Sequence, residues 1–153
     1  MYFVWIILSL LAGYWICEWP RRAFSTGSRP IKRSQMENSR QRLSVTLFYL
    51  WIIVAGLLLT LAGVLLARHL APGLWERFFV PWIMFLIHGG FGIAIGIFEL
   101  VVGLSPGFYF VQNSGAEDRF FCDRARAHKV GTWRILSCSF VNAAVFVVSR
   151  VLD

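Results

Sequence analysis

The chain has 153 residues, of which 58% are hydrophobic and 16% aromatic, and it carries a formal net charge of +7. A soluble domain typically contains about 25% charged residues, whereas only 15% of these residues are charged. Because the charges gather in a few short stretches between long apolar runs, the composition excludes an ordinary soluble domain and predicts an integral membrane protein. A chain of this length holds a single membrane domain, residues 1–153, without a sizeable soluble part.

Four apolar segments are candidates for membrane spans, at about residues 2–19, 43–67, 82–104 and 130–150. The second exceeds the roughly 20 residues that a span requires, which implies a tilted helix. The fourth has only 15 uncharged residues, between Arg134 and Arg150. It spans only if both arginine side chains extend toward the interfaces and residues 130–133 join the helix. The sequence therefore predicts an all-α membrane protein with four transmembrane helices and short loops.

The basic residues are distributed unevenly over the connections between these segments. Seven lie in the loop at residues 20–42, and five lie in the loop at residues 105–134. With four spans these twelve fall on one side of the membrane, and Arg68, Arg77 and Arg150 fall on the other. Because basic loops stay on the inner side, both chain termini are predicted on the outer side.

The basic loop at residues 20–42 is also a candidate surface for lipid headgroups. It contains a single acidic residue, Glu37. Each basic residue near an anionic lipid surface contributes about 1 kcal/mol of binding, and no helix-turn-helix or aromatic-interleaved pattern accompanies the charge. We therefore expect anionic lipids as bound partners and no nucleic acid. The basic residues concerned are Arg21, Arg22, Arg29, Lys32, Arg33, Arg40 and Arg42.

The third apolar segment contains IMFLIHGGFGIAIGIFEL, residues 83–100, with four glycines and two ionisable residues. Four glycines and Glu99 recur at intervals of three or four residues along this segment. On a helix, this spacing places all five residues within about an 80° arc of one face. These residues are Gly89, Gly92, Gly96, Glu99 and Gly103. A face of glycines lets another helix approach closely. We predict that these four glycines form a helix-packing face, with a cofactor or substrate against the same face as the alternative.

Glu99 and Asn142 are polar residues inside predicted spans. A carboxylate near mid-membrane costs at least about 2.5 kcal/mol, so Glu99 should face protein or water and have a partner. The simplest interpretation is a protonated or paired acid near the inner interface, with Arg134 or another chain as its partner. The alternative is a proton or cation site. Asn142 is interpreted as an interhelical hydrogen-bonding residue.

His88 lies about 16 Å along the helix from Glu99, in the outer half of the membrane. Its simplest interpretation is an interhelical hydrogen bond. The alternative is an axial ligand to haem or chlorophyll. A six-coordinate haem needs a second ligand, and neither His69 nor His128 is well placed, so such a haem would sit between this chain and another subunit.

The sequence contains no catalytic signature. It has no phosphate-binding loop, zinc-protease helix or CxxC pair, and its three cysteines lack metal-ligand spacing. We therefore expect a non-catalytic accessory or structural subunit that packs with other membrane subunits in a larger complex. A respiratory or photosynthetic complex, in a bacterial inner membrane or an organellar energy-converting membrane, is the specific hypothesis. The alternatives are a cofactor-holding subunit with His88 as ligand and a small homo-oligomeric transporter that uses Glu99.

Overall fold

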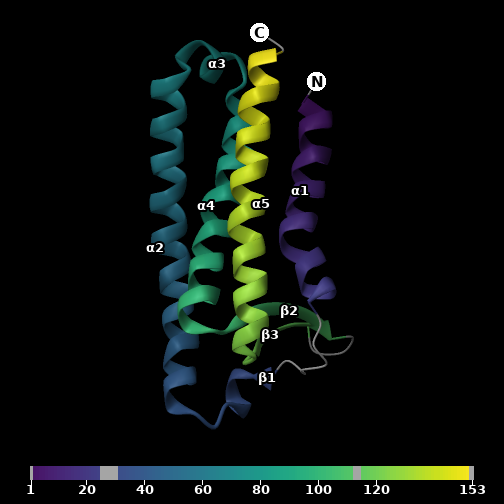
Figure 1. Ribbon diagram of the computed structural model, residues 1–153, viewed down its shortest axis with the longest axis vertical. Coiled ribbons are helices and arrows are strands. Elements are labelled where there is room, and N and C mark those ends of the chain that lie inside the picture. Colours follow the sequence, from purple (N-terminus) through teal and green to yellow (C-terminus); the bar gives the residue numbers. More distant parts are fainter. Residues whose placement is uncertain (1, 25–30, 112–114, 152–153) are drawn as a thin grey trace.

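The computed structural model describes residues 2–24, 31–111 and 115–151 (Figure 1). Within these residues the chain forms five α-helices, one short 3-10 helix (η1) and three strands. In chain order these are α1 (Tyr2–Ala23), β1 (Ile31–Lys32), η1 (Arg33–Gln35), α2 (Ser39–Leu70), α3 (Pro72–Arg77), α4 (Phe79–Val102), β2 (Ser105–Val111), β3 (Gly115–Phe121) and α5 (Arg124–Val151).

Three of the described helices, α2, α4 and α5, are long and apolar enough to cross a membrane, which indicates an integral membrane protein. They correspond to the second, third and fourth predicted spans. The helix α5 begins at Arg124, so residues 130–133 are helical, as spanning by this segment requires. The apolar part of α1, Phe3–Ile16, is shorter than the roughly 20 residues of a full span.

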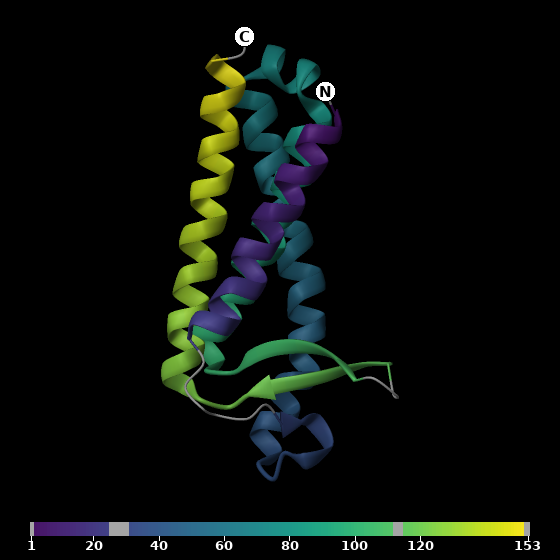
Figure 2. The ribbon, with the colours of Figure 1, turned by 90° about the vertical axis from the view of Figure 1, so that its right-hand side faces the viewer.

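The helix α4 lies at the centre of the bundle, with α2 on one side and α5 on the other (Figure 1). In the most apolar stretch of α4, 44% of the residues are buried, against 17% in α2 and 28% in α5. The helix α1 crosses α4 obliquely and packs against both α4 and α5 (Figure 2). The central position of α4 explains why its sequence is rich in glycine, since it must accommodate close neighbours on several faces.

Local capping interactions fix where the long helices begin and end. The side chain of Asn38 accepts a hydrogen bond from the backbone N–H of Arg40 at 2.9 Å and so caps the start of α2. At the start of α5, the Oδ1 atom of Asp123 accepts from the backbone N–H groups of Ala125 and Arg126. The helix α4 ends at Gly103, whose φ of 76° is left-handed.

The structure adds a small sheet that the all-α prediction missed. The strands form a three-stranded antiparallel sheet in the order β1-β3-β2, in which Phe120 of β3 pairs with Ile31 on one side and Pro106 on the other. The loop predicted at residues 105–134 is therefore a β-hairpin followed by the first turns of α5. Sequence patterns missed it because Pro106 and Gly107 are typical of a connection, and strands this short carry little periodic signal.

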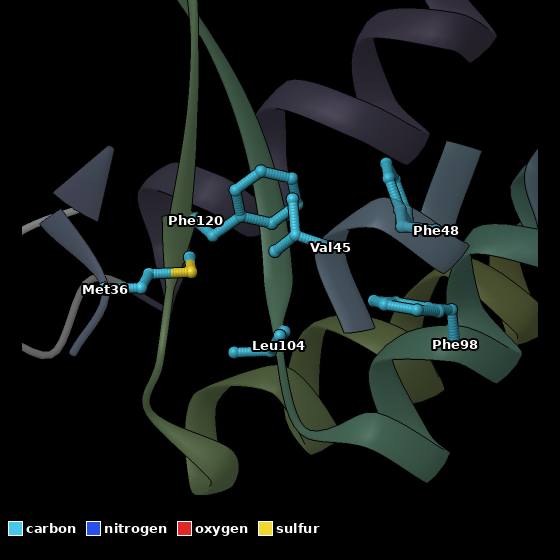
Figure 3. Packing of buried hydrophobic residues seen from close by; sticks show 6 residues of the cluster. All are labelled: Met36, Val45, Phe48, Phe98, Leu104 and Phe120. Carbon is cyan, nitrogen blue, oxygen red and sulfur yellow. The ribbon is translucent and has the colours of Figure 1, made fainter. Parts of the chain in front are cut away.

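The sheet lies at one end of the bundle, called here the sheet end (Figures 1 and 2). It closes over a cluster of buried apolar side chains from two helices, one strand and two connecting segments (Figure 3). At its centre, the Phe48 ring contacts those of Phe98 and Phe120 edge to face, with centroids 4.7 and 5.7 Å away. The cluster consists of Met36, Val45, Phe48, Phe98, Leu104 and Phe120.

Candidate functional site

A buried polar cluster surrounds Glu99, near the C-terminal end of α4. The Glu99 side chain is fully buried. Ser105, the first residue of β2, donates a hydrogen bond from its Oγ to Glu99 Oε1 at 2.7 Å. Arg134 of α5 places its Nε 3.0 Å from Glu99 Oε2. Each carboxylate oxygen therefore has a partner, one from the sheet and one from a neighbouring helix.

Arg126 adds a second buried cation to this cluster. Its side chain is only 2% exposed, and its guanidinium carbon lies 3.4 Å from the centre of the Phe121 ring, within cation–π range. The Arg126 charge also acts on the Glu99 carboxylate. Arg126 is held in place because it belongs to the first turn of α5, which Asp123 caps.

This cluster joins the end of α4, the start of β2, the end of β3 and the first turns of α5. Removing one partner of a buried ion pair costs about 3–5 kcal/mol, because the other charge is left buried alone. The arrangement therefore holds the sheet end of the bundle together. Since both Glu99 oxygens are engaged within the chain, the geometry favours the interpretation of Glu99 as a paired acid over that of a transport site.

The glycine face of α4 lies against α5. A β carbon added at Gly92 would lie 2.3 Å from Cys138 Sγ, and one added at Gly96 would lie 2.9 Å from the backbone oxygen of Gly131. Gly89 is also close to α5, because a β carbon there would lie 2.0 Å from the Asn142 side chain. The two helices approach this closely only because the three α4 positions lack side chains.

Gly103 also lies near α5, because a β carbon there would lie 3.0 Å from Arg124 Cγ, but its backbone conformation differs from that of the helical glycines. It lies beyond the last helical residue of α4, and its left-handed backbone ends the helix while its N–H donates to the carbonyl oxygen of Glu99. The spacing that joined Gly103 to the other glycines assumes a continuing helix, which the structure does not have at this residue.

A second close contact, between α4 and α2, was missed by the sequence analysis. A β carbon at Gly90 would lie 2.9 Å from the backbone oxygen of Gly56, and one at Gly56 would lie 2.6 Å from the Phe91 ring. The signal was present in α2, where Gly56 and Thr60 have the small-xxx-small spacing of packed membrane helices. Gly90 itself points away from the arc of the other glycines, so it serves the opposite side of α4.

His88 joins α4 to α1. Its Nε2 lies 2.8 Å from the hydroxyl of Ser9, and its backbone oxygen accepts a weak hydrogen bond from the Cys138 thiol at 3.8 Å. Ser9 is 1% exposed, so the side-chain bond is an interhelical contact away from solvent. A haem or chlorophyll bound to Nε2 would have to displace Ser9.

An elongated groove of about 320 Å³ runs between α2 and α5, with α4 as its floor. Its floor includes Gly89 and Gly90, and its walls are mostly leucine, phenylalanine and other apolar residues. The buried Nε1 of Trp82, a residue that lines this groove, lacks a hydrogen-bond partner among the residues that the structure describes. The half-buried Asn142 also lines the groove, and its amide Nδ2 lies over Gly89.

The predicted lipid-binding residues are only partly described by the structure. Arg29 lies outside the described residues, as do the side chains of Arg21, Arg22 and Arg33. Arg40 is exposed in the first turn of α2. Two further residues form hydrogen bonds within the chain. The Nε of Arg42 donates to the backbone oxygen of Met36, and the backbone N–H of Lys32 donates to the side-chain oxygen of Gln35.

The described side chains form no group of three or more His, Cys, Asp or Glu residues that could hold a metal ion. Cys122 and Cys138 carry free thiols. Cys122 is half-buried between β3 and α5, and this burial raises the pKa of its thiol above the ordinary value.

In comparisons with known proteins, no family model, curated protein or solved structure matches the chain.

Proposed function

We propose that this chain is a non-catalytic accessory subunit of a larger membrane complex, and that the groove between α2 and α5 receives a transmembrane helix of a partner subunit. The main supporting observation is the buried Nε1 of Trp82, which has no hydrogen-bond partner among the described residues, at a groove that the Asn142 amide also lines. In a bilayer, lipid tails cannot hydrogen-bond an amide, whereas a neighbouring helix can.

The composition of the groove also favours a helix as its occupant. Helix pairs in membranes associate through small residues that allow close backbone approach, with polar side chains hydrogen-bonding across the interface. Gly63, Gly89 and Gly90 line this groove together with Asn142. The same two kinds of residue, glycines and polar side chains, also form the contact between α4 and α5 within the chain.

The partners found for the ionisable residues support a structural role. Glu99 is engaged by Ser105 and Arg134, and His88 by Ser9. Each of these contacts joins separate elements of the chain. A residue that stabilises the fold in this way is less available for proton coupling or cofactor ligation, so we favour the accessory role over the transporter and the cofactor-holding subunit.

We further propose that α1 is the fourth transmembrane helix and that the sheet end faces the inner side of the membrane. Basic residues of the sheet end include Arg40, Arg124 and Lys129, whereas Arg68 and Arg150 belong to the opposite ends of α2 and α5. The start of α1 and the end of α5 lie together at that opposite end (Figure 1). Under the positive-inside rule, both termini are then on the outer side.

The test compares two adjacent leucines of α2 that are both 58% exposed. Leu66 lines the groove, whereas Leu65 does not. The tagged protein is extracted from its native membrane in mild detergent, and the mass and polypeptide content of the particle are measured. We expect a large particle with several different chains, which loses a partner in Leu66→Trp and keeps it in Leu65→Trp. A particle that contains this chain alone would overturn the proposal.

A further inference from the structure

A second pocket, of about 370 Å³, lies at the sheet end, on the side of the bundle where α1 meets α5. It is separate from the groove between α2 and α5 and shares no residue with it. All but one of its residues belong to α5. Its lining consists of Phe24, His128, Lys129, Thr132, Trp133 and Leu136.

The polar half of this pocket has the donors that an anionic phosphate group requires. Lys129 is exposed and has no ion-pair partner among the described residues. Thr132 lies three residues further along α5, on the same face of the helix, and offers an exposed hydroxyl group. His128 also lines this half of the pocket, but its Nε2 is buried away from solvent, without a hydrogen-bond partner within the described part of the chain. Among the described residues that line the pocket, none is acidic.

The other half of the pocket is apolar and continues along α5. Leu136 and Phe140 follow Lys129 at positions seven and eleven residues further on and are 64% and 65% exposed. These residues lie on one helix face, and the distance from Lys129 to Phe140 is about 16 Å along the helix axis. This length is comparable to that of a fatty acyl chain inside one leaflet.

Tryptophan side chains hold the two halves of the pocket in place. Trp133 donates a hydrogen bond from Nε1 to the backbone oxygen of Trp15 at 3.2 Å. Its ring also lies against those of Trp15 and Trp19, with centroids 4.9 and 4.4 Å away. Such a tryptophan cluster is typical of the membrane–water interface, where a lipid headgroup would lie.

We propose that this pocket binds an anionic phospholipid, with the headgroup phosphate beside Lys129 and Thr132 and an acyl chain along Leu136 and Phe140. The charge complementarity selects an anionic headgroup over a zwitterionic one. The apolar strip that begins inside the pocket selects a lipid over free phosphate, because a free anion would leave that strip uncovered.

The experiment uses the purified full chain and counts bound lipids by native mass spectrometry, after addition of phosphatidylglycerol or phosphatidylcholine with identical acyl chains. We expect the wild-type chain to retain phosphatidylglycerol preferentially. Lys129→Gln should weaken this retention about fivefold, the effect of one basic residue at a lipid surface. Arg124→Gln, an equal charge change at an exposed residue of the same helix outside the pocket, should leave it unchanged.

A second variant tests the acyl strip. Phe140→Ala leaves the charges intact and should lower phosphatidylglycerol retention, while inorganic phosphate should fail to displace the bound lipid. Equal retention of the two lipids, or an Arg124→Gln effect as large as that of Lys129→Gln, would overturn the proposal. Displacement of the lipid by inorganic phosphate would overturn the assignment of a lipid to this pocket.

Discussion

The Nε of Arg134 lies 3.0 Å from Oε2 of Glu99, and the two side chains are 6% and 0% exposed. This ion pair lies next to a close backbone contact between the two helices that carry it. Gly96 precedes Glu99 by three residues, and Gly131 precedes Arg134 by three residues, so the glycine contact and the ion pair occupy the same faces. The absence of side chains at the two glycines brings the backbones close enough for the charges to meet.

Glu99→Leu should strongly destabilise the protein. The substitution leaves Arg134 buried without its carboxylate and removes the acceptor of Ser105, at a cost of about 3–5 kcal/mol in the free energy of unfolding. The measurement is denaturant unfolding of the purified protein in detergent, followed by circular dichroism. Glu76→Leu, at an exposed residue of α3, should change that free energy by less than about 0.5 kcal/mol. Equal effects of the two substitutions would contradict the structural role of Glu99.

Hydropathy was sufficient to predict the three long membrane helices, because an apolar run of this length has few alternatives to a spanning helix. For α1 the prediction of a span stays a prediction, because the apolar part of this helix, Phe3–Ile16, is shorter than a full span. The same method could not detect the sheet, because Phe120 and Pro106 are paired through backbone hydrogen bonds between segments that lack a strand-like pattern.

The partner of Glu99 was partly predictable. A buried carboxylate demands a cation, and Arg134 was one of two candidate partners from the sequence. The contributions of Ser105 and Arg126 were not predictable, because both depend on how the sheet closes over the helix ends. The helix-ending role of Gly103 was not predictable either, since a helix-ending glycine and a packing glycine have the same spacing in the sequence.

The alkylation of Cys122 should shift to higher pH than that of an exposed cysteine. Burial raises the pKa of this thiol, and only the thiolate reacts. At pH values near about 8.5, the ordinary pKa of cysteine, Cys122 should therefore be less ionised than an exposed thiol. The measurement is the rate of iodoacetamide labelling of the Cys122 peptide as a function of pH, by mass spectrometry.

A cysteine introduced at Ser34, an exposed residue, provides the control for this pH profile. Poor access to Cys122 lowers the labelling rate equally at all pH values, so the midpoint of the profile separates a raised pKa from simple shielding. A midpoint for Cys122 at or below that of the introduced cysteine would show that burial does not raise this pKa.

His88 and Ser9 should be energetically coupled, because their side chains form one hydrogen bond between α4 and α1. His88→Ala, Ser9→Ala and the double variant form a double-mutant cycle of unfolding free energies. We expect a coupling of about 0.6 kcal/mol, and at most about 1.7 kcal/mol, the range for hydrogen bonds between membrane helices. The exposed His69, combined with Ser9 in the same way, should show no coupling.

The visible absorption of the same preparations tests the other interpretation of His88. A visible band in the wild-type protein that disappears in His88→Ala but persists in Ser9→Ala would support a ligand role. Additive effects of the two substitutions on stability would contradict the interhelical hydrogen bond as a stabilising contact.

Gly92→Ala should destabilise the contact between α4 and α5, and Cys138→Ala should suppress that effect. The new β carbon would lie 2.3 Å from Cys138 Sγ but 3.8 Å from Cys138 Cβ, so removing the sulfur removes the clash. Overpacking of this kind costs about 1–3 kcal/mol. In a double-mutant cycle of unfolding free energies, the double variant should be more stable than the sum of the single effects predicts.

Gly73→Ala, where a β carbon meets nothing within 4 Å, is the control and should not destabilise the protein. Additive effects of the Gly92 and Cys138 substitutions would mean that this glycine face does not determine how closely the two helices approach.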